Sequence, residues 1–463
     1  MVADSAVERA KRGKGIRSEV PRSAHADLES ESSSRDPVAL LEEQGTTRVP
    51  ELVPIRYGRM LVSPFTFFRG SAYLMAADLA GAPRTGLEVQ LCGDAHLSNF
   101  GAFAAPDRRL VFSLNDFDET LPGPFEWDVK RLVASFAVAG RDRGFKAKQR
   151  HAINLAAGRA YREAMRSFAQ MRTLDVWYAR QDVDEIARQW AAQVSGKQLK
   201  RFERNVAKAR AKDSLRAFEK LTENVDGEAR IVSDPPVLVG VEEAVPPGEV
   251  DQISEVVGTI IHSYQRTLAP DRRRLLERFR YVHAARKVVG VGSVGTRAWI
   301  MLLTGRDADD PLLLQFKEAG ASVLEPFLGK SKFRNHGQRV VEGQRLTQAA
   351  SDVLLGWIRH PGFDGVDRDY YIRQLWDGKG SALIELMNPA TLGVYAEICG
   401  WALARAHARS GDPAAIAGYL GSGDSFDRAL ASFAEAYADQ NERDYAALRE
   451  AVDSGKIEAE CGL

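Results

Sequence analysis

Two short apolar runs early in the chain each lead into an acidic residue, and they constrain the fold more than any other feature. Residues 89–92 precede Asp94, and residues 110–114 precede Asp116. Short apolar runs bounded by turn residues are typical of buried strands. Each acid therefore stands at a predicted strand end, where the backbone turns and a side chain can face solvent or a ligand.

The residue types around these two acids suit the transfer of a phosphoryl group. Residues 93–99 read Gly-Asp-Ala-His-Leu-Ser-Asn, and residues 115–118 read Asn-Asp-Phe-Asp. A carboxylate beside an acceptor hydroxyl can take its proton. Mg²⁺ prefers carboxylate and amide oxygens and keeps several waters. The alternative for each residue taken singly is that it caps a turn.

The two segments resemble the catalytic loop and the metal-binding turn of aminoglycoside and choline kinases, which read His-Gly-Asp-x-His-x-x-Asn and Ile-Asp-Phe-Asp. The resemblance implies that Asp94 and His96 are catalytic, with Asp94 as the base. It also implies that Asn99 and Asp116 bind Mg²⁺ against the phosphates of ATP. Cys92 stands where these kinases usually carry their first histidine.

A glycine-rich segment forms a second constellation much later in the chain. Residues 290–297 read Gly-Val-Gly-Ser-Val-Gly-Thr-Arg, between predicted strands at 287–289 and 298–303. A dinucleotide-binding fold needs a helix after such a segment, whereas a strand follows here. Glycines let backbone N–H groups approach phosphate oxygens without a Cβ clash, which favours a hairpin over phosphates. The residues expected to cover the phosphates are Gly290, Gly292, Ser293 and Gly295.

The next predicted strand, 312–319, is apolar except near its end, where it carries Lys317. A lysine in this place is expected to bind the α- and β-phosphates of ATP. Kinases hold this lysine with a glutamate from the following helix. The predicted helix at 338–351 offers Glu342 for that role, and Glu325 is the alternative.

The acidic turns precede the glycine-rich hairpin, whereas kinases have the opposite order. Either the two halves are unrelated, or a kinase-like fold is circularly permuted. A permutation preserves a fold when the old termini lie close together and the new cut falls in a loop. The predicted helix at 392–409 favours permutation, because small-molecule kinases have a similar helix directly before the catalytic loop.

From about residue 37 to residue 440 the chain closely resembles a bacterial family known as domain of unknown function 2252. The matching blocks are residues 63–70, 92–100, 115–120, 127–131, 288–296, 338–345 and 404–411. This family is grouped with protein-kinase-like folds. The resemblance thus implies an α+β, circularly permuted, two-lobe fold with a small antiparallel β lobe and a mainly helical lobe, but it names no reaction.

Four segments are expected from these assignments. Residues 1–36 are a flexible tail, and residues 37–280 hold the catalytic-loop part of the helical lobe with a helical insertion. Residues 281–376 form the β lobe with the glycine-rich loop. Residues 377–463 form a connector and the C-terminal helices that complete the helical lobe.

Four charged residues near the first acidic turn have two possible roles each. Arg56, Arg59 and Arg69 can contact phosphates, or they can pair with other parts of the protein. The resemblance implies that Asp128 supports the catalytic loop from behind. An ordinary carboxylate at a helix N-terminus is the alternative.

The composition excludes several functional classes. Lys plus Arg equals Asp plus Glu at 63 each, so no net charge attracts nucleic acid or an anionic membrane. The basic run at 197–216 has few aromatic residues between its charges and is expected to be a solvated helix face. Without a long apolar run or an apolar leader we expect no membrane span and no signal peptide. Three cysteines without short spacing favour the cytoplasm.

The leading hypothesis is a phosphotransferase that uses ATP and Mg²⁺ and acts on a small hydroxylated or amino-bearing acceptor. A nucleotide-binding pseudokinase or scaffold is the alternative, motivated by Cys92 and by the unusual order. Transfer of the nucleotide instead of the phosphoryl group is a third hypothesis. We expect neither nucleic acid nor a membrane as partner. The sequence predicts neither the acceptor nor the oligomeric state.

Overall fold

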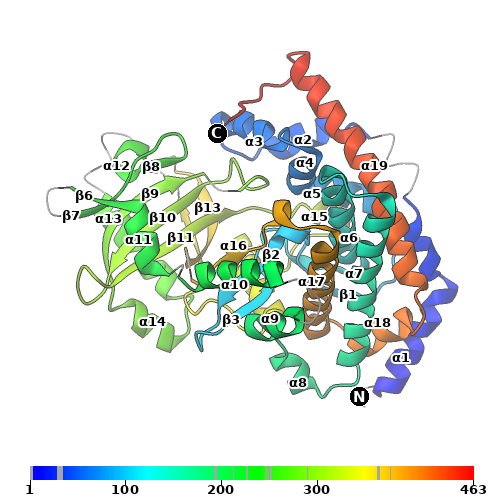
Figure 1. The fold of residues 1–463 in the computed structure, drawn as a ribbon. Coiled ribbons are helices and arrows are strands. Elements are labelled where there is room, and N and C mark those ends of the chain that lie inside the picture. The colour runs from blue at the N-terminus through cyan, green and yellow to red at the C-terminus, as the bar shows by residue number, and fades with distance from the viewer. Residues whose placement is uncertain are drawn as a thin grey trace.

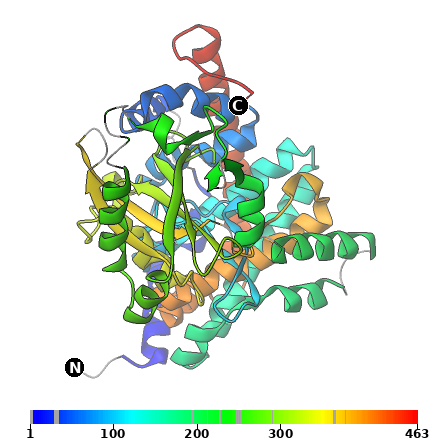
Figure 2. The same cartoon turned by 90° about the vertical axis from the view of Figure 1, so that its left-hand side faces the viewer.

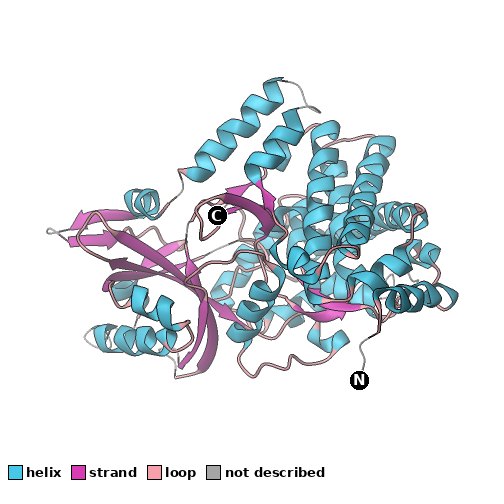
Figure 3. Cartoon of the chain, turned by 90° about the horizontal axis from the view of Figure 1, so that it is seen from below, coloured by secondary structure: helices cyan, strands magenta, loops and turns pink. Residues whose placement is uncertain are grey.

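The protein has an α+β fold, in which a curved antiparallel sheet lies beside a larger group of helices (Figure 1). The computed structural model describes residues 4–28, 35–191, 196–211, 213–225, 228–245, 248, 250, 253–288, 290–361, 365–375 and 377–462. Figure 3 shows the strands gathered on one side and most helices on the other. The expected combination of an antiparallel sheet with a helical part is confirmed.

The main sheet has six antiparallel strands in the order β12-β13-β11-β10-β9-β8. Their bounds are Leu238–Gly240 (β8), Arg280–Lys287 (β9), Ala298–Thr304 (β10), Pro311–Ala319 (β11), Gly356–Pro361 (β12) and Asp367–Gln374 (β13). Since β8 belongs to this sheet, the β part begins well before residue 281, where the sequence was expected to start it. Figure 2 looks at the molecule from the side of this sheet.

Side chains of β11 alternate between the two faces of the sheet, as the strand repeat requires. Leu314 and Phe316 pack in the same apolar cluster as α13 (Ile253–Gln265). Leu313 packs in another cluster with α11 (Ser214–Leu221). Lys317 lies on the Leu313 side, and this face turns toward the helical part. The sheet is also covered by α12 (Val241–Ala244), α14 (Pro270–Leu276) and α16 (His336–Thr347).

The helical part is built around long helices that share one large apolar cluster. Helix α17 (Pro389–Ser410) packs along α7 (Ala147–Phe168), and α19 (Ser425–Asp453) packs against α7 and α6 (Phe125–Asp142). The other helices after α7 are α8 (Thr173–Tyr178), α9 (Val183–Ala191), α10 (Gly196–Arg210), α15 (Glu325–Leu328) and α18 (Pro413–Leu420). No helix in the described residues is long and apolar enough to cross a membrane.

Small sheets carry the acidic turns at the junction between the two parts. Strand β1 (Glu88–Leu91) pairs with β4 (Leu121–Pro124), which contains Pro122 and Pro124. A two-stranded sheet tolerates prolines because its outer edge needs no donors. A second sheet has the order β14-β2-β3-β5, with bounds Phe100–Ala104 (β2), Leu110–Leu114 (β3), Gln181–Asp182 (β5) and Gly380–Ser381 (β14). Strands β6 (Thr222–Val225) and β7 (Glu228–Ile231) form a separate hairpin.

The N-terminal segment is folded against the helical part, so the expected flexible tail is wrong for residues 4–28. Helix α1 (Ala6–Gly15) crosses α18, and a Cβ on Gly13 would lie 1.9 Å from the Ala415 carbonyl oxygen. The polar composition concealed this contact, because a glycine packs backbone on backbone and leaves no apolar stripe. Residues 29–34 lie outside the described part. The next helices are α2 (Pro37–Gly45), α3 (Val53–Met60), α4 (Pro64–Gly70) and α5 (Ala72–Ala80).

Candidate active site

The first acidic turn follows β1 and is shaped by Gly93. This residue has φ +86°, and a Cβ there would lie 2.3 Å from the Glu119 carbonyl oxygen. Only glycine combines this left-handed conformation with such a close approach. The turn therefore brings Asp94 next to the segment that follows the second acidic turn. The two turns meet although β1 and β3, the strands before them, belong to different sheets.

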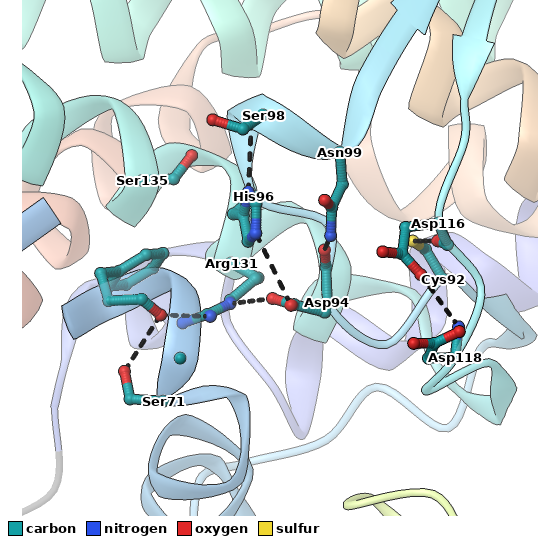
Figure 4. A network of polar contacts seen from close by, with 12 residues as sticks. Ser71, Cys92, Asp94, His96, Ser98, Asn99, Asp116, Asp118, Arg131 and Ser135 are labelled. Atoms are coloured by element: carbon teal, nitrogen blue, oxygen red, sulfur yellow. Dashed lines mark hydrogen bonds and ion pairs between the residues drawn. The ribbon is translucent and has the colours of Figure 1, made fainter. Parts of the chain in front are cut away.

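Asp94 is fixed by a charged partner that the sequence did not single out. The Nε of Arg131 donates to its Oδ1 at 2.8 Å, as Figure 4 shows. Arg131 also donates to the carbonyl oxygen of Phe68 at 2.6 Å and stacks on the ring of that residue. Burial raises the pKa of Asp94, while Arg131 and Arg69 oppose the rise. A raised pKa makes the carboxylate a better proton acceptor.

His96 is buried and uncharged. Its Nδ1 accepts the backbone N–H of Ser98 at 3.2 Å, so the ring proton lies on Nε2. Nε2 stands 3.7 Å from Oδ2 of Asp94, too far for a strong hydrogen bond but close enough to orient the carboxylate. Burial, followed by the charges of Arg69 and Arg131, holds the pKa of His96 well below its ordinary value.

Asp128 lies behind the first acidic turn and holds its backbone, at the place that the resemblance assigned to it. Its carboxylate accepts the backbone N–H of Cys92 at 2.6 Å and that of Gly93 at 3.0 Å. The Nε2 of His407, near the end of α17, completes its environment at 3.3 Å. Both α6 and α17 therefore fix the backbone that carries Asp94.

Cys92 connects the two acidic turns from the position where a histidine was expected. Its thiol donates to the backbone carbonyl of Asp116 at 3.0 Å. Burial raises the pKa of this thiol well above its ordinary value, so it stays protonated and can donate. The two turns are linked a second time, because the N–H of Asn115 donates to the carbonyl of Asn99 at 3.0 Å.

Asn99 and Asp116 border the same cavity and offer oxygens of the kind that Mg²⁺ binds. The Nδ2 of Asn99 donates to the carbonyl of Asp94 at 2.8 Å, which leaves its side-chain oxygen for another partner. Burial and the neighbouring Asp118 raise the pKa of Asp116, while Lys317 and Arg373 lower it. No cluster of three or more His, Cys, Asp or Glu in the described residues can hold a metal by itself. Mg²⁺ needs no such cluster where phosphates supply the other oxygens.

Lys317 meets Asp118, two residues beyond the predicted metal ligand. Its ammonium forms an ion pair with Oδ2 of Asp118, whose Oδ1 accepts the hydroxyl of Tyr371 at 2.8 Å. Burial by itself lowers the pKa of Lys317, but Asp118, Tyr371 and Asp116 outweigh it and raise the pKa. The lysine thus stays charged although its side chain is 4% exposed.

The predicted pairing of Lys317 with Glu342 is wrong in this structure. Glu342 pairs with Arg345 at 3.2 Å on the partly exposed side of α16. Arg339 and Gly343, four residues apart, form the face that points to the second acidic turn, and Glu342 lies off that face. The alternative, Glu325, lies 3.9 Å from His336 instead.

Arg339 was missed by the sequence analysis and joins three segments around the site. Its guanidinium donates to the carbonyls of Thr120 at 2.8 Å, Asp118 at 2.7 Å and Gly320 at 2.8 Å. Asp118 and Arg131 could have been selected from the sequence, because each lies in a block already noted for its pattern. Arg339 also lies in such a block, residues 338–345, but it was passed over because an arginine on an amphipathic helix ordinarily lies at its surface.

The glycine-rich segment folds as a turn between β9 and β10 and lies over the acidic turns. Gly290 and Gly295 have φ of +73° and +92°, which explains the glycines at these places. The hydroxyl of Ser293 donates to Oδ2 of Asp118 at 3.3 Å. A Cβ on Gly292 would lie 3.2 Å from the carbonyl of Arg69, so this glycine permits a close contact with α4. Val289, predicted to end the preceding strand, lies outside the described residues.

A cavity of about 190 Å³ unites the two constellations. The predicted residues that line it are Asp94, His96, Asn99, Asp116, Gly290, Gly292 and Ser293. Lys317 reaches this wall through Asp118, and Gly295 backs onto Arg48 at the edge of the loop. A larger cavity of about 620 Å³ lies on the α13 face of the main sheet and contains none of the acidic turns. By volume alone the cavity on the α13 face would be the candidate site. The residue types favour the smaller cavity between the acidic turns and the glycine-rich segment.

Residues 48–451 match a family described as "Uncharacterized protein conserved in bacteria (DUF2252)". The chain belongs to this family. Neither a curated protein nor a solved structure matches it. The DUF2252 match covers both acidic turns, the glycine-rich segment and α16, so all the predicted residues that line the cavity lie within the family region.

Proposed function

We propose that this DUF2252 protein is a phosphotransferase that uses ATP and Mg²⁺ to phosphorylate a small molecule. The observation that carries the proposal is the cavity in which Asp94, Asn99 and Asp116 face the glycine-rich segment. These groups come from distant parts of the chain, and each is of the type that phosphoryl transfer requires. If Asp94, Asn99 and Asp116 only capped turns, the glycine-rich segment would not need to face them.

In this proposal Asp94 takes the proton of the acceptor hydroxyl or amine. Arg131 fixes its orientation at 2.8 Å, and burial raises its pKa, which favours the proton transfer. Asn99 and Asp116 would hold Mg²⁺, and their oxygens fit the preference of this ion. Mg²⁺ would supply positive charge where negative charge develops on the phosphates.

The glycine-rich segment would cover the phosphates, and Lys317 would bind them. Lys317 is paired with Asp118, so it stands in place before any ligand enters. Gly290, Gly292 and Gly295 leave room for phosphate oxygens beside backbone N–H groups. Ser293, bonded to Asp118, adds a hydroxyl to the same wall.

The arrangement is consistent with a circularly permuted kinase-like fold, which forms part of this proposal. Helix α17 comes late in the chain but packs behind the catalytic loop, where the hydroxyl of Tyr395 donates to the Leu97 carbonyl at 2.7 Å. In the order of a kinase this helix would run directly into that loop. The kinase-like part of this chain would begin near β1, the strand before the catalytic loop, and end with α17.

A second candidate is a nucleotide-binding protein without phosphoryl transfer. The ion pair between Arg131 and Asp94 favours it, because a paired carboxylate is a weaker base than a free one. Transfer of AMP instead of phosphate is a third candidate. The mass added to the acceptor distinguishes the two transfer reactions.

Calorimetry with Mg²⁺ and ATP tests the proposal directly. We expect the wild-type protein to bind the nucleotide and to release ADP slowly in the presence of water as acceptor. Asp116→Asn should abolish the Mg²⁺-dependent part of this binding, whereas Arg274→Ala, an exposed change in α14, should not. If the wild-type protein binds no Mg·ATP, the proposal is wrong. If it binds ATP but yields neither ADP nor pyrophosphate with any of many metabolites, the second candidate is correct.

A further inference from the structure

Three arginines in the N-terminal helices were open to two interpretations in the sequence, and the structure separates them. Arg56 is fully buried and donates to the side-chain oxygen of Gln44 and to the carbonyl of Gly70 at 3.0 Å. Arg59 donates to the carbonyl of Gly290 at 2.6 Å and so fastens the glycine-rich segment. These two have structural partners, whereas the third, Arg69, lines the cavity itself.

The guanidinium of Arg69 has no bonded partner in the part of the chain that the structure describes. Among the described residues no ion pair or hydrogen bond to this side chain is found, and its Nε is buried without an acceptor. Burial lowers the pKa of Arg69, and only the more distant charges of Asp94 and Asp116 oppose this effect. A half-buried cation without a bonded anion is costly, so this position favours an anionic ligand.

The end of α4 is held firmly enough to aim this side chain. Arg131 of α6 donates to the carbonyl of Phe68, and Arg56 of α3 donates to that of Gly70. The carbonyls on both sides of Arg69 are therefore anchored by other helices. Its own carbonyl lies against Gly292 of the glycine-rich segment, where a Cβ would approach to 3.2 Å.

The surroundings of Arg69 identify the kind of anion. Asp94, the proposed base, and Asp116, the proposed metal ligand, are the carboxylates that act on its charge, and all three residues border one cavity. A transferred phosphoryl group must lie between the base and the metal ligand. Guanidinium groups bind such oxygens through two parallel N–H donors and stabilise the charge that develops during transfer.

We infer that Arg69 binds the γ-phosphoryl group of ATP, as a guanidinium supplied from the protein's own N-terminal helices. This inference rests on the proposed function. In the step that it assists, the acceptor oxygen or nitrogen forms a bond to the γ-phosphorus while the bond from that phosphorus to the bridging oxygen breaks. ADP leaves with the bonding electrons, and the acceptor proton passes to Asp94. Arg69 donates hydrogen bonds to the non-bridging oxygens and is unchanged at the end.

Arg48 strengthens the inference from the other side of the glycine-rich segment. Its guanidinium donates to the carbonyl of Val294, and its side chain packs where a Cβ on Gly295 would lie. It has no ion pair to a carboxylate in the described residues, and its Nε is buried without an acceptor. Arg48 is a positioning residue, since it shapes the loop that Arg69 abuts.

The experiment compares diphosphate and triphosphate binding in the full-length protein. Affinities for Mg·ADP and for the Mg²⁺ complex of a non-hydrolysable ATP analogue are measured for the wild type, Arg69→Ala and Arg69→Lys, with Arg274→Ala as the surface control. We expect Arg69→Ala to weaken the analogue about tenfold and Mg·ADP less than about twofold, and to slow ATP turnover about 10³-fold. The affinity of Arg69→Lys for the analogue should lie between those of the wild type and Arg69→Ala. Lysine keeps the positive charge but lacks the planar pair of N–H donors.

The ratio of the two affinities comes from one sample, so partial misfolding of a variant does not change it. A wild-type ratio in both variants, with nucleotide binding intact, would overturn the role of Arg69 and leave the proposed function standing. Equal weakening of both nucleotides would also overturn it, because it would indicate a general role in shaping the cavity. A wild-type protein that binds neither nucleotide would overturn both proposals together.

Discussion

The two walls of the cavity are held in very different ways. The acidic wall is fastened from inside the helical part: Asp128 binds two backbone N–H groups, Arg131 binds Asp94, and Cys92 bonds to the other turn. The glycine-rich wall is a turn whose carbonyls are held from outside by Arg59, Arg48 and the backbone N–H of Val49. Under the proposed function, the first would be a fixed wall that carries the chemistry, and the second an adjustable wall that admits the ligand. The predictions below test this contrast, from the largest expected effect to the smallest.

Removal of the carboxylate behind the first acidic turn should have the largest effect. Asp128→Ala leaves the buried N–H groups of Cys92 and Gly93 without an acceptor, and it removes the partner of Nε2 of His407. We expect the free energy of unfolding to fall by about 3 kcal/mol, as measured by urea denaturation. Asp424→Ala, which removes an exposed ion pair with Arg428, should cost less than about 0.5 kcal/mol. Similar losses in both variants would show that the acidic wall is not specially braced.

Arg339 connects the two walls, and its loss should have the next largest effect. Arg339→Met leaves the carbonyls of Asp118, Thr120 and Gly320 without this donor in a buried place. A loss of about 2 kcal/mol in unfolding free energy is expected, together with weaker nucleotide binding. Glu342→Ala on the same helix is the matched control and should change neither quantity measurably. A large effect of Glu342→Ala on nucleotide affinity would restore the pairing predicted from the sequence.

A change in the glycine-rich wall should cost less stability but still affect the ligand. Gly295→Ala forces a side chain into φ +92° and places its Cβ 2.9 Å from Arg48. We expect about 1.5 kcal/mol of destabilisation from the backbone strain and a severalfold weaker nucleotide affinity. Gly423→Ala meets open space and serves as the control, with little change in thermal melting or binding. Unchanged nucleotide binding in Gly295→Ala would contradict the role of this wall.

The smallest effect concerns pH, through Glu119 between the two walls. Burial raises the pKa of Glu119 from 4.5 to about 7, while its carboxylate accepts the N–H of Val323 at 2.8 Å. Because the folded protein holds this proton more tightly, its contribution to stability is fully present below pH 4.5 and is lost as the pH rises to about 7. The side chain is only partly buried, so we expect a loss of about 1 kcal/mol across this window.

Glu119→Gln should remove this part of the pH dependence. Denaturation curves at several pH values between about 4.5 and 8 measure the slope for both proteins. The variant should show a flatter decrease in stability toward neutral pH than the wild type. Parallel curves would mean that Glu119 is already charged in the folded protein at low pH.

Local sequence patterns predicted much of the fold because they reflect local forces. The apolar runs at 110–114, 298–303 and 312–319 became β3, β10 and β11 with nearly the expected ends. The helix expected at 392–409 is part of α17. The glycines of residues 290–297 predicted a turn there. Gly290 and Gly295 do have positive φ, a conformation that most other residues avoid.

The errors lie where tertiary contacts outweigh local patterns. Helix α1 docks through Gly13, which carries no apolar signal, so the tail prediction failed. The partner of Lys317 depends on which face of α16 turns inward, and the pattern of the helix did not distinguish Glu342 from Arg339. Arg69 was recognised as a candidate, but only the fold shows that it borders the cavity while Arg56 is buried elsewhere.

The central claim is that two distant segments of the chain form one nucleotide site. Hydrogen–deuterium exchange, with and without Mg²⁺ and a non-hydrolysable ATP analogue, tests it most directly because it reports on each segment separately. We predict slower amide exchange in residues 92–118 and in residues 290–297 together, with no change in α1. Protection of only one of these segments, or protection confined to the larger cavity on the α13 face, would contradict the claim.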